Sequence, residues 1–147
     1  MLTQLLTEDV IRIEPAARDW RQAIELATAP LLANGTIEPS YVAALFSSHE
    51  ELGPYYVLGP GLAMPHARPE DGVNRLGLGL TVIKQGVNFD SEGNDPIRLL
   101  ITLAASDSDS HVETIAQLAE LFMNEEDVAA IIAADTKDDI LRILARY

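Results

Sequence analysis

The stretch LGLGLTVIKQGVNFDSEGNDPIRLLITLAA, residues 76–105, decides the fold class. Its two ends, residues 76–83 and 97–105, are apolar runs with the length of buried strands. The residues between them, Gln85-Gly86 and Glu92 to Pro96, favour turns. The first run alternates leucine with glycine, which in a strand indicates close packing against a neighbouring element. The stretch therefore predicts two buried strands of a sheet.

The flanking segments extend this prediction in both directions. Further short strands are expected over residues 10–13, 55–58 and 62–64, and helical periodicity covers residues 16–34, 39–52, 110–122, 128–134 and 138–147. Pro30 favours a kink in the first helix or an early end to it. Helices before and after a cluster of strands indicate an α/β fold. We predict a single domain, residues 1–147, with a central mixed β-sheet and helices on both faces.

Composition excludes several classes of function. The 147 residues include 23 acidic and 10 basic side chains, a net charge of −13, and no cysteine. An acidic surface is repelled by nucleic acid and by anionic membranes. Disulfides, thiol nucleophiles and cysteine-ligated metals are excluded. The N-terminus lacks the features of a signal peptide, and no stretch has the ~20 apolar residues of a membrane span, so we expect a cytoplasmic protein without membrane insertion.

One loop carries a candidate reactive side chain. In GPGLAMPHARP, residues 59–69, His66 directly follows Pro65, and Arg68 precedes Pro69. Prolines restrict the backbone, so the imidazole is presented on a stiff loop next to a strand. Arg68 offers planar donors suited to phosphate or carboxylate oxygens. The alternative is an ordinary surface loop in which Arg68 pairs with Glu70 or Asp71.

A second histidine lies near the start of a predicted helix. Ser110 to Glu113 fits a capping box, which places His111 in the first helical turn beside free N–H groups. His66, Arg68 and His111 could then converge on one anion. The alternative is that Ser110 simply caps the helix and that His111 is exposed.

The other candidates favour structural roles. His49 lies at the end of a predicted helix, where a cation complements the helix dipole. Trp20 is expected in the core. The wide spacing of the three histidines forms no metal-binding motif, and no phosphate-binding loop or hydrolase motif is present.

Residues 53–73, GPYYVLGPGLAMPHARPEDGV, resemble the phosphorylation-site region of EIIA proteins of the bacterial phosphotransferase system, in the mannitol/fructose-type superfamily. The A-M-P-H-x-R form, with the preceding G-P-Y and P-G-L, is most similar to the ascorbate-type branch. The resemblance continues through residues 94–105 and His111 and covers nearly the whole chain.

The resemblance implies a phosphotransferase that acts as a relay, without cofactor or metal. Phosphorylated HPr would donate to His66, and His66 would pass the group to a cysteine of a separate EIIB, which serves an EIIC membrane transporter for a sugar or a sugar acid such as ascorbate. His111 would contact the phosphoryl group or orient His66. A homodimer is left open. A histidine of ordinary pKa, about 6.5, is mostly neutral and nucleophilic at pH 7, so no base is needed.

This chain departs from the mannitol-type pattern at two positions. Those members carry an arginine upstream and a glutamate shortly before the phosphorylated histidine, where this chain has His49-Glu50 and Pro60. We infer that Arg68 supplies the positive charge. Two other functions stay open: a regulatory domain switched by phosphorylation of His66, and a metal-dependent hydrolase that uses the histidines.

Overall fold

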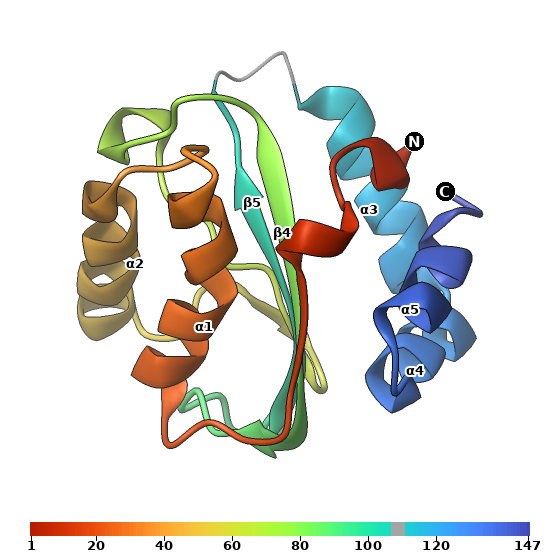
Figure 1. Cartoon of the computed structure of the whole chain (residues 1–147). Helices are drawn as coiled ribbons and strands as arrows, with labels where there is room; N and C mark the ends of the chain where they lie inside the picture. Colours follow the sequence, from red (N-terminus) through yellow and green to blue (C-terminus); the bar gives the residue numbers. More distant parts are fainter. Residues whose placement is uncertain (107–110) are drawn as a thin grey trace.

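A mixed β-sheet forms the centre of the structure (Figure 1). The computed structural model describes residues 1–106 and 111–147, and within them five strands follow the order β1-β4-β5-β3-β2. β4 pairs parallel with β1 and antiparallel with β5, while β3 pairs parallel with β5 and antiparallel with β2. The predicted mixed sheet is confirmed. The strands are β1 (Ile11–Glu14), β2 (Val57–Gly59), β3 (Leu62–Ala63), β4 (Gly77–Val87) and β5 (Ile97–Ala104).

Helices cover both faces of the sheet, as predicted (Figure 1). One face carries α1 (Trp20–Ala33) and α2 (Pro39–Leu52); the other carries α3 (Val112–Met123), α4 (Glu125–Ala133) and α5 (Lys137–Leu144). Short 3-10 helices occur at η1 (Leu2–Gln4), η2 (Glu8–Val10) and η3 (Pro69–Asp71). The two ends of the chain meet, because the Leu2 amide donates to the Tyr147 carbonyl at 3.2 Å. No helix of the described residues is both long and apolar enough to cross a membrane.

The glycines of β4 allow α1 and the chain that follows it to lie directly on the strand. A Cβ atom at Gly77 would lie 2.5 Å from Cγ2 of Thr36, and one at Gly79 would lie 3.4 Å from the Ala27 carbonyl oxygen. Side chains at these positions would therefore push α1 and Thr36 away from the sheet. The alternation of leucine and glycine thus has the predicted packing role.

The first helix starts later than predicted, whereas its C-cap, Asn34, is the last residue of the predicted range. It begins at Trp20 rather than Ala16, because the Asp19 side chain caps it by accepting from the Gln22 amide at 2.9 Å. It also continues past Pro30, where an end was considered. Pro30 cannot donate to the Leu26 carbonyl, and that oxygen accepts instead from the Arg12 guanidinium at 3.5 Å. An outside donor thus compensates for the proline.

The parallel pairing of β3 with β5 determines where the candidate site lies. Ala63 pairs with Leu100, so both strands leave the sheet at the same edge, the upper one in Figure 1. The chain after Ala63 leads to His66, and the chain after Ala104 leads to His111 at the start of α3. The topology therefore brings His66 and His111 to one edge of the sheet.

Candidate functional site

The backbone around His66 is held by hydrogen bonds to three separate parts of the chain: the turn before β2, the strand β5 and the helix α2. The Met64 amide donates to the Tyr56 carbonyl at 2.9 Å, and the Pro65 carbonyl accepts from the amide of Leu103 in β5 at 3.0 Å. The Ala67 amide donates to the hydroxyl of Tyr41 in α2 at 2.9 Å. The loop is therefore fixed by hydrogen bonds in addition to its prolines.

The His66 imidazole has a defined orientation. Its Nδ1 lies 2.8 Å from the Met64 carbonyl oxygen. A carbonyl oxygen can only accept, so Nδ1 carries the proton and Nε2 keeps its lone pair. The ring is half-buried, and the Tyr55 ring meets it edge-on with centroids 5.5 Å apart. The nitrogen of this side chain that has a free electron pair is thus Nε2.

His66 and Arg68 line one cavity of about 520 Å³ between the loop and α2. Tyr55 and Ser48 contribute hydroxyl groups to its wall, and Asp71 contributes a carboxylate. Its other lining residues are Ala44, Ser47, Glu51, Leu52 and Ala67. The cavity brings the imidazole of His66 and the cation Arg68 together, and the Tyr55 hydroxyl in its wall already donates to the His66 carbonyl.

Arg68 is exposed, and its guanidinium forms no ion pair within residues 1–106 and 111–147. The Asp71 carboxylate accepts from the backbone amide of Arg68 at 3.0 Å. Asp71 therefore shapes the 3-10 turn that follows the loop without neutralising the side chain of Arg68. The sequence alternative was an ion pair between the Arg68 side chain and Asp71. In the structure, Asp71 bonds the backbone amide of Arg68 instead.

His111 lies at the N-cap position of α3 and is half-buried. It is at the same edge of the sheet as His66, but it is not among the residues that line the 520 Å³ cavity. The predicted cap, Ser110, lies outside the described residues. The role of His111 towards His66 stays a prediction.

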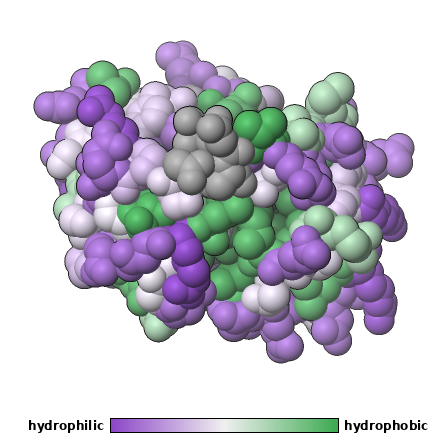
Figure 2. Space-filling model, turned by 90° about the horizontal axis from the view of Figure 1, so that it is seen from above, coloured by the Kyte–Doolittle hydropathy of each residue, from purple (hydrophilic) through white to green (hydrophobic). Residues whose placement is uncertain are grey.

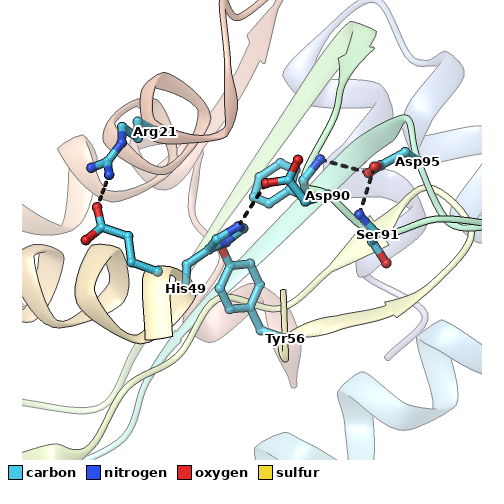
Figure 3. A network of polar contacts seen from close by, with 8 residues as sticks. Arg21, His49, Tyr56, Asp90, Ser91 and Asp95 are labelled. Carbon is cyan, nitrogen blue, oxygen red and sulfur yellow. Dashed lines mark hydrogen bonds and ion pairs between the residues drawn. The ribbon is translucent and has the colours of Figure 1, made fainter. Parts of the chain in front are cut away.

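His49 is a core residue rather than a cation at the end of a helix, and Figure 3 shows its ring facing Tyr56 and Asp90. Its ring is 4% exposed and stacks on Trp20, with centroids 3.7 Å apart and 5° between the planes. Nδ1 lies 2.7 Å from the Tyr56 hydroxyl, and Nε2 lies 3.8 Å from the Asp90 carboxylate. Burial lowers the pKa of His49, although Asp90 opposes the effect. The expected dipole role is therefore wrong, because burial disfavours the charged form.

Sequence reasoning missed the tyrosines around the loop. The sequence places Tyr55 and Tyr56 in the predicted strand 55–58 and Tyr41 in the predicted helix 39–52, without a role for their hydroxyls. In the structure, the Tyr55 hydroxyl donates to the His66 carbonyl, and the Tyr41 hydroxyl accepts from the Ala67 amide. The Tyr56 hydroxyl forms a hydrogen bond with Nδ1 of His49. These partners lie 7 to 26 residues away along the chain, so no local pattern indicates them. No group of three or more metal-ligating side chains occurs within the described residues.

Residues 4–147 match the protein family described as "Phosphoenolpyruvate-dependent sugar phosphotransferase system, EIIA 2". The chain belongs to this EIIA family. It is therefore a phosphotransferase component of a sugar phosphotransferase system, as the resemblance implied.

Three relatives of this EIIA chain illustrate the similarity. The ascorbate-specific PTS system EIIA component of Shigella boydii is 40% identical over 92% of this chain and 89% of its own. The solution structure of the mannitol-specific cryptic phosphotransferase enzyme IIA of Escherichia coli has a TM-score of 0.91 and 41% identity, with 99% of both chains covered. The complex of mannitol enzyme IIA with phosphorylated enzyme IIB, also from E. coli, matches with a TM-score of 0.82, 29% identity, and 97% and 100% coverage.

Proposed function

We propose that this EIIA carries a phosphoryl group on Nε2 of His66. Phosphorylated HPr is the donor: Nε2 attacks phosphorus as the bond from phosphorus to the HPr histidine breaks. A cysteine thiolate of EIIB then attacks, the P–N bond to His66 breaks, and Nε2 regains its lone pair. The observation that carries the proposal is the contact of Nδ1 with the Met64 carbonyl, which leaves Nε2 as the nucleophile.

Arg68 is the proposed stabiliser of the transferred group. Phosphoryl transfer needs in-line positioning and charge stabilisation more than acid or base catalysis. Arg68 lines the same cavity as His66. One cation suits a carrier that must release its phosphoryl group again. His111 is proposed to contact the same group or to orient His66.

The surface suits a protein partner. Seen from the edge where β5 ends, the molecule is apolar near the centre and hydrophilic around it (Figure 2). Apolar centres with polar rims are typical of protein interfaces. The net charge of −13 would attract basic docking faces on HPr or EIIB. An EIIB partner is further supported by the E. coli complex of mannitol enzyme IIA with phosphorylated enzyme IIB.

The relatives support a proposal for the transport step. We propose that the relay serves, through EIIB and a membrane EIIC, the uptake of a sugar or a sugar acid such as ascorbate, in the cytoplasm where HPr acts. Ascorbate-specific and mannitol-type components are similar to this chain at about the same level. In the proposed relay, EIIA contacts proteins and a phosphoryl group but not the sugar. The residues of its cavity therefore do not determine which sugar is transported.

Incubation with Enzyme I, HPr and ³²P-labelled phosphoenolpyruvate tests the proposal. The wild-type chain should take up acid-labile label, and His66→Ala should take up none while it keeps the wild-type thermal midpoint. His111→Ala is the matched control, because it retains His66 and should still become labelled, more slowly. Undiminished label on His66→Ala would refute the proposal.

A further inference from the structure

Two tyrosine hydroxyls hold the peptide unit that joins His66 to Ala67. The Tyr55 hydroxyl donates to the His66 carbonyl at 2.5 Å, and the Ala67 amide donates to the Tyr41 hydroxyl at 2.9 Å. The Tyr41 hydroxyl in turn donates to the carbonyl of Leu103, near the end of β5, at 2.7 Å. Both polar groups of a single peptide unit are therefore fixed by side chains.

The two tyrosines come from different environments. Tyr41 lies in the first turn of α2 and is fully buried; burial is the main cause that raises its pKa to about 12, so its hydroxyl keeps its proton. Tyr55 lies in the turn between α2 and β2, is 39% exposed and lines the cavity. Tyr41 is thus part of the core, whereas Tyr55 belongs to the wall of the site.

The hydrogen bonds of this peptide unit complete the restraint of the histidine. On the N-terminal side, Pro65 restricts the backbone and its carbonyl is bonded to Leu103. On the C-terminal side, the tyrosines fix the next peptide plane. With both planes fixed, the Cα–Cβ bond of His66 has one direction, and the Nδ1 contact with Met64 fixes the ring itself. Nε2 therefore points in one direction before a partner arrives.

We propose that Tyr55 is a positioning residue for phosphoryl transfer, which acts by holding the His66–Ala67 peptide so that Nε2 is aligned for in-line attack. This inference rests on the proposed function of His66. Tyr55 transfers no proton and contacts no reacting atom in the proposed step. Its hydroxyl holds the His66 carbonyl by a hydrogen bond, and its ring packs edge-on against the His66 imidazole.

Tyr55→Phe is the variant that separates positioning from folding. It keeps the ring, and the cavity gives water access to the freed His66 carbonyl, so little stability should be lost. Tyr41→Phe would leave buried backbone groups unpaired and is less suitable. Tyr147→Phe is the matched control, because it removes an equally short hydroxyl contact, 2.5 Å to Asp127, on the other face of the sheet.

Two measurements test Tyr55→Phe against wild type and Tyr147→Phe. Quench-flow experiments measure phosphoryl transfer from phosphorylated HPr. At saturating HPr, the transfer rate of Tyr55→Phe should be roughly tenfold to a hundredfold lower than that of wild type, with little change in KM. The reason is that displacing a reacting group by about 1 Å can lower the rate by up to about a hundredfold. Ring ¹⁵N spectra of unphosphorylated His66 should show a larger fraction of the tautomer protonated at Nε2. Tyr147→Phe should match wild type in both.

Wild-type transfer rates together with unchanged ring spectra in Tyr55→Phe would overturn the inference. A lower rate accompanied by a lower thermal midpoint and unchanged ring spectra would also overturn it, since the hydroxyl would then serve stability alone. If wild-type His66 takes up no phosphate, the proposed function fails. In that case the ring spectra still decide whether Tyr55 positions the imidazole.

Discussion

Nδ1 of His66 lies 2.8 Å from the carbonyl oxygen of Met64, two residues before it in the chain. This contact assigns the proton to Nδ1 and the free electron pair to Nε2. It depends on the Met64 backbone, which is held in turn by the Tyr56 carbonyl. The hairpin formed by β2 and β3 therefore determines which nitrogen of His66 can act as nucleophile.

Arg68→Ala should slow transfer from phosphorylated HPr by roughly tenfold or more, because hydrogen bonds to charged groups contribute about 1.5–3 kcal/mol. Arg68→Lys should recover part of the rate, since it keeps the charge and loses the planar donors. The control is Arg142→Ala on α5, which is exposed and pairs with Asp139. Equal transfer rates for Arg68→Ala and Arg142→Ala would show that Arg68 does not stabilise the transferred phosphoryl group.

His111→Ala should leave the fold intact and slow phosphoryl transfer at least tenfold, a loss of about 1.4 kcal/mol of transition-state stabilisation. The half-buried position of His111 at the start of α3 explains the small structural effect. Val112→Ala, at an exposed neighbouring position, is the control. Rapid-quench kinetics measure both variants, and a wild-type rate for His111→Ala would show that this histidine is only structural.

His49 should make the protein less stable in mild acid. Burial lowers the pKa of His49 in the folded state, so the unfolded chain binds more protons between that lowered pKa and about 6.5. The free energy of unfolding should therefore fall as the pH drops below about 6.5, by at most about 1.4 kcal/mol per pH unit from this group. The loss should level off once the pH is below the folded-state pKa.

Urea unfolding of wild type and of His49→Gln between pH 5 and pH 8 measures this contribution as the difference between the two pH profiles. His49→Gln should be less stable throughout, because Tyr56 and Trp20 lose their partner. The same pH dependence in both proteins would show that His49 does not titrate with folding.

Gly77→Ala should destabilise the fold by about 1–3 kcal/mol, the usual cost of an added group in a packed interior. Its Cβ would lie 2.5 Å from Cγ2 of Thr36. Gly59→Ala in the edge strand β2 of the same sheet is the matched control, because a Cβ there meets nothing within 4 Å. Thermal unfolding compares the two, and equal midpoints would contradict close packing at β4.

The fold was largely predictable, because its main signals are local. The apolar runs of β4 and β5 and the periodicity of the helices each lie within one short segment. The capping of α1 by Asp19 was missed because several residues before Trp20 could begin the helix. The donor that allows Pro30 inside α1 comes from β1 and could not be predicted from the helix alone.

The candidate site was predictable only in part. His66 and Arg68 stand out because prolines surround them, and both line the cavity. The hydroxyls of Tyr41 and Tyr55, and the burial of His49 against Trp20, depend on how distant elements pack. A tyrosine that bonds a backbone group leaves no pattern along the chain, so its role emerges only in three dimensions.

The central claim is that the phosphoryl group is carried on Nε2 of His66. Long-range ¹H–¹⁵N NMR correlation spectra of the chain, phosphorylated with Enzyme I, HPr and phosphoenolpyruvate, test it most directly. We predict that phosphorylation shifts Nε2 of His66 and that Nδ1 keeps its proton. Phosphate found on Nδ1 of His66, or on any other residue, would contradict the account.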